Sequence, residues 1–143
     1  MAEKNRYDLS QEEKAGIIIL LRKLLEGRPE ISFAYLHGSF VENDPYHDID
    51  VAVYLRDLPA SVLRYELELE AQCAQVVSPG AVDIRILNGA PLSFRYNVLK
   101  RGFVLFVKND DERTDFIEAV LGQYFDFAPY RAIYLKEALG IGV

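Results

Sequence analysis

The sequence predicts an α/β domain with a small mixed sheet of about four strands flanked by helices. Two observations predict it: apolar residues alternate along short segments, and between these segments apolar residues recur at three- and four-residue spacing. The chain has 143 residues, of which 50% are hydrophobic and 27% are charged. These values are typical of a folded globular domain of ordinary size. We therefore expect a single domain over residues 1–143.

The first part of this domain is expected to contain one helix and two strands. The segment Ser10-Gln-Glu-Glu13 has the form of a capping box, which predicts a helix that starts there and ends near Gly27. Residues 31–37 are predicted to form the first strand. Residues 48–55 are predicted to form the second, because their apolar residues alternate regularly.

A second helix is predicted from Pro59, at a first-turn position, to about Val77. Leu63, Leu67 and Cys73–Ala74 recur at helical spacing, and we expect them to face inward. Cys73 is the only cysteine, so it cannot form an internal disulfide and is interpreted as a small core residue.

The remaining chain is predicted to add two strands and two helical segments. The strands are 82–87 and 103–107, and a short helix ending near Arg101 lies between them. A last amphipathic helical segment covers about 110–140, with Asp110 or Asp111 as its cap. Pro129 predicts a kink there. Its aromatic residues exceed what one helical face requires, so some are expected to contact a partner: Phe116, Tyr124, Phe125, Phe127, Tyr130 and Tyr134.

Composition narrows the functional classes. The formal net charge of −6 argues against direct DNA binding, which needs a basic face. The run Ile17–Leu21 is too short to cross a bilayer, and no signal-type segment follows the charged start, so we expect a soluble, cytoplasmic protein without membrane contact. A single cysteine and two histidines leave no material for a cysteine-based zinc site.

Three aspartates and a glycine-serine turn form the candidate site. Asp48 and Asp50 are two residues apart on the second strand, so they project from one face with Cα atoms roughly 6.6–7 Å apart. Asp83 begins the next strand on its polar side. The turn at Gly38 and Ser39 offers backbone N–H groups and a hydroxyl opposite these acids. Carboxylates that converge in this way suit two divalent metal ions.

In this order, the segments Leu36-His-Gly-Ser-Phe40, Asp48-Ile-Asp-Val-Ala-Val53 and Val82-Asp-Ile-Arg85 resemble the nucleotidyltransferase core of the DNA polymerase beta superfamily. The resemblance covers about residues 31–87 and is nearest to the minimal nucleotidyltransferase (MNT) family. The tail from Arg113 through Tyr134 resembles members of that family that are paired with a small helical toxin of the HEPN ribonuclease class.

The resemblance implies a role for each site residue. Gly38 and Ser39 would hold the nucleotide phosphates, Asp48 and Asp50 would bind two Mg²⁺ ions, and Asp83 would share the catalytic metal and help activate the attacking hydroxyl. It further implies an antitoxin that transfers AMP from ATP to a tyrosine of a partner HEPN toxin, with which it would form a hetero-oligomer. Oxygen ligands without nearby His or Cys agree with Mg²⁺.

The chain departs from many members of that family in the loop Phe40-Val-Glu-Asn-Asp-Pro-Tyr-His47, which has no basic residue apart from the histidine. We expect Arg85 or Arg56 to supply the missing cation for nucleotide binding. Arg85 is the better candidate because it lies two residues beyond Asp83 on the same face. A salt bridge from Arg85 to Asp83 is the alternative interpretation. His37 and His47 are interpreted as structural.

Two other functions remain open from the sequence. One is nucleotidyl transfer to a small molecule such as an aminoglycoside, although no second domain is apparent to hold that substrate. The other is a non-catalytic antitoxin that neutralises its toxin by binding alone.

Overall fold

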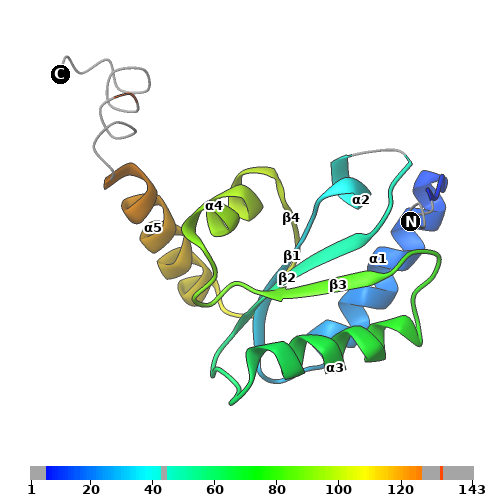
Figure 1. The fold of residues 1–143 in the computed structure, drawn as a ribbon, viewed down its shortest axis with the longest axis horizontal. Helices are drawn as coiled ribbons and strands as arrows, with labels where there is room; N and C mark the ends of the chain where they lie inside the picture. Colours follow the sequence, from blue (N-terminus) through cyan, green and yellow to red (C-terminus); the bar gives the residue numbers. More distant parts are fainter. Residues whose placement is uncertain (1–5, 43–44, 127–132, 134–143) are drawn as a thin grey trace.

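The computed structural model describes residues 6–42, 45–126 and 133, and within them the chain forms a four-stranded mixed sheet with helices on both faces (Figure 1). The strands are β1 (Ile31–His37), β2 (Ile49–Leu55), β3 (Val82–Ile86) and β4 (Phe103–Val107). They lie in the order β3-β2-β1-β4. Strand β1 is antiparallel to β2 and β4, whereas β2 and β3 are parallel. The predicted α/β fold class with a small mixed sheet is confirmed.

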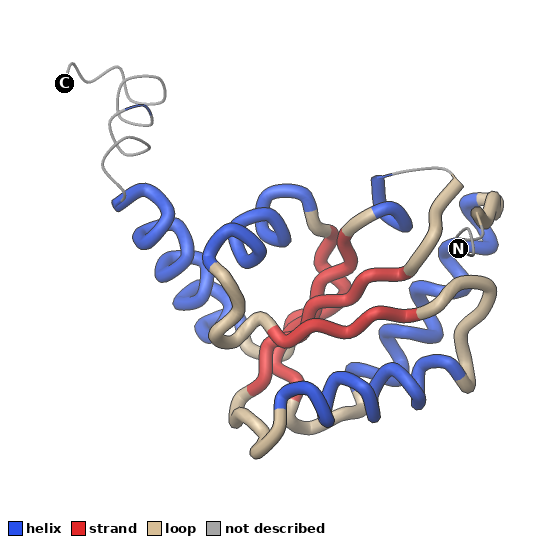
Figure 2. Tube along the Cα trace, viewed as in Figure 1, coloured by secondary structure: helices blue, strands red, loops and turns tan. Residues whose placement is uncertain are grey.

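Helices lie against both faces of this sheet (Figure 2). The helices are α1 (Gln11–Glu26), the short α2 (Ser39–Glu42), α3 (Val62–Ala74), α4 (Leu92–Arg101) and α5 (Asp110–Asp126). Leu21 of α1 and Leu69 of α3 share one buried cluster with the sheet, and Val98 of α4 and Phe116 of α5 share the other. In the described ranges, every helix falls short of the length and hydrophobicity needed to cross a membrane.

Helix α1 has the predicted start. The Ser10 hydroxyl accepts a hydrogen bond from the Glu13 amide at 3.1 Å, and the Glu13 carboxylate accepts one from the Ser10 amide at 3.1 Å. This reciprocal pair satisfies two amides that a helix start would otherwise leave without partners. The predicted capping box is therefore confirmed.

The prediction for the second helix was wrong at its start and on its buried face. Helix α3 begins after Ser61, whose hydroxyl accepts from the Arg64 amide at 3.2 Å, and not at Pro59. Leu63 and Leu67 are 65% and 56% exposed, whereas Leu69 and Cys73 are buried. Cys73 is thus the expected core residue.

The reason lies in the sheet edge that α3 covers. The Glu66 carboxylate accepts a hydrogen bond from the Ile86 amide at 2.9 Å, and the Glu70 carboxylate accepts one from the Ile84 amide at 2.8 Å. Strand β3 is at the end of the sheet, so these amides have no neighbouring strand to bind. Two glutamates therefore supply the hydrogen-bond acceptors that a further strand would otherwise supply. Because they occupy the side of α3 that faces the sheet edge, Leu63 and Leu67 face outward.

The last helix, α5, is capped by Asn109 and not by Asp110 or Asp111. The Asn109 side-chain oxygen accepts from the Glu112 amide at 3.0 Å. The two aspartates lie in the first turn, where their charge complements the helix dipole. Phe116 is a core residue and not a partner contact, since it packs on Phe33 and Tyr54. The predictions for Phe127, Pro129, Tyr130 and Tyr134 lie outside the described residues.

Candidate active site

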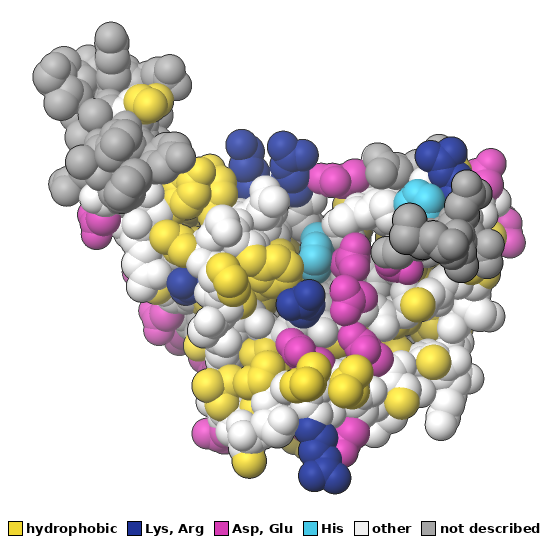
Figure 3. All heavy atoms as spheres, viewed as in Figure 1, with side chains coloured by type: hydrophobic (Ala, Val, Ile, Leu, Met, Phe, Trp, Pro, Cys, Tyr) yellow, Lys and Arg dark blue, Asp and Glu magenta, His cyan; other side chains and the backbone are white. Residues whose placement is uncertain are grey.

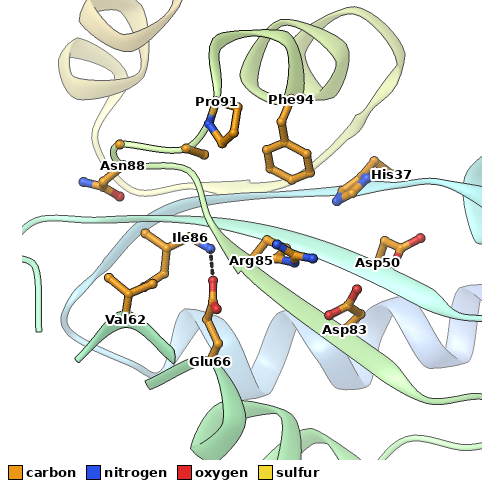
Figure 4. Close-up of a pocket in the computed structure, with 12 residues that line it drawn as sticks. His37, Asp50, Val62, Glu66, Asp83, Arg85, Ile86, Asn88, Pro91 and Phe94 are labelled. Atoms are coloured by element: carbon orange, nitrogen blue, oxygen red, sulfur yellow. Dashed lines mark hydrogen bonds between the residues drawn. The ribbon is translucent and has the colours of Figure 1, made fainter. Parts of the chain in front are cut away.

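One sheet face carries a row of polar side chains across three strands. His37 of β1 is the register partner of Asp50 of β2, and Asp50 is the register partner of Asp83 of β3. Register partners on neighbouring strands project from the same face. Figure 4 shows Asp50 and Asp83 side by side, with His37 and Arg85 close to them. The parallel pairing of β2 and β3 thus brings together two acids that are far apart in the sequence.

These residues line a cavity of about 550 Å³. His37, Asp50, Asp83 and Arg85 form its sheet side, and its other walls come from α3 and α4: Val62, Glu66, Pro91 and Phe94. Acidic side chains gather over the neighbouring ends of β2 and β3, with apolar side chains on both sides of them (Figure 3). The size suits a small-molecule ligand, and the acids and the arginine can bind polar or charged groups.

Gly38 forms the turn that leads from β1 into this cavity. Its φ of +76° lies in the left-handed region that side chains disfavour. A Cβ at this position would also collide with a carboxylate oxygen of Asp50. Only glycine therefore allows the backbone of the turn to lie directly against the Asp50 carboxylate.

The next residue, Ser39, ties the two ends of its loop together. Its hydroxyl accepts a hydrogen bond from the His47 amide at 3.1 Å and donates one to the Asp48 carbonyl at 3.4 Å. Asp48 lies directly before β2, beside this turn, and is half-buried. The cavity lining includes Asp50 and Asp83 but not Asp48. Two of the three predicted metal ligands are thus together in the cavity, and the third lies beside the turn.

The donor set suits Mg²⁺ because it consists of carboxylate oxygens. Negative charge is also concentrated here. Burial raises the pKa of Glu70, and the neighbouring Asp83 carboxyl raises it further. In the described parts of the chain, no group of three or more His, Cys, Asp or Glu side chains is close enough to hold a metal ion. The metal role of Asp48, Asp50 and Asp83 therefore stays a prediction, with Asp50 and Asp83 as its centre.

Arg85 is the cation of this cavity. It is exposed, and it forms no ion pair or hydrogen bond within the described residues, so the alternative salt bridge to Asp83 is absent there. Glu42, an acid of the loop after Gly38, forms its ion pair with Arg101 of α4, with 3.8 Å between Oε1 of the carboxylate and Nη1 of the guanidinium. The guanidinium of Arg85 is therefore available to an anionic ligand, which its predicted role in nucleotide binding requires.

His37 has a place that the sequence reasoning missed. It lines the cavity, its ring meets Phe94 edge-on at 5.5 Å, and its Nε2 atom is buried without a hydrogen-bond partner. Burial lowers the pKa of His37, and Arg85 lowers it further, against the opposing charges of Asp83 and Glu42. Burial thus favours the neutral form of the imidazole beside the two acids. The sequence carried no local signal for this place, because the strand pairing that puts His37 opposite Asp50 is seen only in the structure.

The sequence of the chain settles its family. Residues 20–111 match the family described as "Polymerase beta, Nucleotidyltransferase", a stretch that covers more than half of the 143 residues. The chain belongs to the polymerase beta nucleotidyltransferase family. The match includes the core motifs at 31–87, so the predicted resemblance is confirmed. The cavity residues from His37 to Phe94 all lie inside the matched part of this nucleotidyltransferase domain.

Solved structures share the fold of this nucleotidyltransferase-family protein. A chain in the complex of tri-AMPylated Shewanella oneidensis HEPN toxin with MNT antitoxin is 24% identical, with a TM-score of 0.60 over 92% of this chain and 99% of that chain. A chain of the MntA-HepT toxin-antitoxin is 23% identical, with a TM-score of 0.59 over 91% and 99%. A chain of the toxin-antitoxin with AMP-PNP is 22% identical, with a TM-score of 0.58 over 88% and 98%. No curated protein matches the sequence.

Proposed function

We propose that this protein is a Mg²⁺-dependent nucleotidyltransferase that transfers AMP from ATP to a tyrosine hydroxyl of a HEPN-type toxin and thereby acts as its antitoxin. The proposal includes a hetero-oligomer with that toxin and a cytoplasmic location. The observation that supports it most strongly is the pairing of Asp50 with Asp83 in the cavity, with Gly38 directly beside Asp50, in a member of this transferase family.

Each residue of the site has a proposed role in binding the metal ion or the nucleotide phosphates. Asp50 and Asp83, with Asp48 beside the turn, would hold Mg²⁺, which neutralises phosphate charge when bound. The backbone at Gly38 and Ser39 would bind the phosphates, because the turn has no Cβ between it and the acids. Arg85 would place its positive charge on the same phosphates, in place of the basic residue that the loop lacks.

Catalysis of this reaction depends on positioning the reacting groups and on stabilising the phosphate charge, and no covalent intermediate with the protein is needed. The tyrosine oxygen forms a bond to the α-phosphorus of ATP while the bond to the β-phosphate oxygen breaks. Pyrophosphate leaves with the electron pair of that bond. The proton of the hydroxyl is taken up by a base, for which Asp83 is the candidate because it faces the cavity.

The solved structures support the choice of nucleotide and acceptor. A toxin-antitoxin with the same fold contains AMP-PNP, an ATP analogue, and in another the HEPN toxin carries three AMP groups. Protein modification is therefore the acceptor chemistry that we propose.

Mass spectrometry tests this proposal. The protein is incubated with ATP, Mg²⁺ and a candidate HEPN-type partner toxin, and the intact mass of the toxin is measured. We expect an increase by one or more AMP units, which disappears in Asp83→Asn while the complex still forms. A toxin that is neutralised without any mass change, equally well by Asp83→Asn, would show that binding alone is the mechanism.

A further inference from the structure

Lys14 is a buried charge that the proposed chemistry does not use. It lies in α1, outside the lining of the cavity that contains Asp50 and Asp83, and is only 8% exposed. Burying an ammonium group costs free energy unless it is compensated. The first turn of a helix adds to this cost, since the positive end of the helix dipole repels a cation. Neither the helix dipole nor solvation therefore explains a lysine at this position. Its tertiary contacts are the remaining explanation.

Those contacts lie on both arms of the loop that contains Gly38 and Ser39. The Lys14 ammonium donates a hydrogen bond to the Phe40 carbonyl at 3.1 Å. It also lies 5.2 Å from the ring centre of Phe40 and 5.4 Å from that of Tyr46, within the range of cation–π attraction. The two rings meet edge-to-face at 4.8 Å. One lysine thus joins the start of the loop to its end.

The carbonyl that Lys14 binds belongs to the short helix α2, which continues directly from the turn. The amides of Val41 and Glu42 donate to the Gly38 carbonyl at 3.1 and 3.0 Å, which closes the short helix α2. Lys14 then holds α2 at the Phe40 carbonyl, one residue after Ser39. A hollow of about 410 Å³ opens next to it between α1, α2 and β4, so packing on this side of the turn is incomplete in the described part of the chain.

We infer that Lys14 is a positioning residue: it fixes the Gly38–Ser39 turn in the geometry that binds the nucleotide phosphates. This inference rests on the proposed nucleotide-binding function and adds a residue outside the matched family segment, which begins at residue 20. Lys14 does not line the cavity that contains Asp50 and Asp83. It acts through the backbone of the turn, and its loss weakens nucleotide binding more than it disturbs the rest of the fold.

Calorimetric titration with Mg²⁺ and AMP-PNP tests the inference on the full chain. Lys14→Met removes the charge and keeps a long apolar side chain, Lys14→Arg keeps the charge, and Lys23→Met is the control on the exposed side of the same helix. We expect the Kd to rise about tenfold in Lys14→Met, the scale of one lost hydrogen bond to a charged group. Lys14→Arg should restore most of the affinity, and Lys23→Met should leave it unchanged.

Three controls keep the outcomes distinct. Thermal unfolding shows whether each variant is folded at the titration temperature, and Lys14→Gln, with an expected loss of about threefold, replaces Lys14→Met if that variant does not fold. A wild-type protein that does not bind Mg²⁺–AMP-PNP would contradict the proposed function itself. Wild-type binding that is matched by folded Lys14→Met or Lys14→Gln, or a Lys14→Arg as weak as Lys14→Met, would overturn the positioning role alone.

Discussion

Gly38 connects backbone geometry to the chemistry of the site at the scale of one residue. Its positive φ is one reason for glycine, and the Asp50 carboxylate beside its Cα is a second. Gly89 has only the first of these two features: its φ is +70°, but a Cβ at this position would meet nothing within 4 Å. The two glycines therefore form a matched pair for mutation.

We predict that Gly89→Ala lowers the free energy of unfolding by about 1 kcal/mol, the cost of a side chain in the left-handed region. Gly38→Ala should lower it by at least about 2 kcal/mol, or displace the Asp50 carboxylate and abolish Mg²⁺-dependent nucleotide binding. Urea unfolding of both variants checks this. Equal losses of stability, with nucleotide binding intact in Gly38→Ala, would show that the contact with Asp50 is unimportant.

Cys73 offers a residue-scale test of the core. The pKa of its thiol is raised to about 11, mainly by burial and also by the charge of Glu70, against the opposing charge of Arg28. A raised thiol pKa means that the fold favours the neutral form, so this contribution to stability is complete below the unfolded thiol pKa. It is lost as the pH rises from there through about 11.

At pH 8 we therefore predict that the folded protein reacts with a thiol reagent at least about 100-fold more slowly than the urea-unfolded chain, since a shift of two pKa units lowers the thiolate fraction by that factor. The reaction rate in each state is measured with an aromatic disulfide reagent, which releases a coloured thiolate when the Cys73 thiolate attacks it. Similar rates in the two states would mean that α3 does not pack as described.

At the scale of elements, α3 shows where sequence periodicity misleads. The spacing of Leu63 and Leu67 predicted an inward face, but Glu66 and Glu70 lie there because the last strand of the sheet needs acceptors for its amides. That need follows from the position of β3 at the sheet end, and strand order is not written in local periodicity. Helix α1, whose capping box is local, was predicted correctly.

The role of Glu66 can be separated from its general helical context. Glu66→Ala leaves the Ile86 amide without its acceptor, so we predict a loss of about 1–2 kcal/mol in the free energy of unfolding. Glu68→Ala is the matched control on the same helix. It removes an exposed pair with Arg64 and should change stability by less than about 0.5 kcal/mol. Indistinguishable denaturation curves for the two variants would argue against capping of the β3 edge by α3.

For the whole molecule, the motifs predicted the family and the acids, because glycine-serine and paired aspartates are local signals. Pairing between strands was beyond the sequence: it places Asp83 opposite Asp50, brings His37 into the same row and leaves Asp48 beside the turn. Lys14 was equally hidden, since its contacts cross from α1 to the loop after β1. The single domain over residues 1–143 stays a prediction.

The measurement that tests the central claim most directly is a titration of the protein with AMP-PNP, with and without Mg²⁺, on the wild type and on Asp50→Asn. We predict binding that requires Mg²⁺ and that is lost in Asp50→Asn, because this carboxylate lies between the turn and Asp83. Thermal unfolding confirms that the variant is folded. Binding of equal affinity without Mg²⁺, or undiminished binding in Asp50→Asn, would contradict the account.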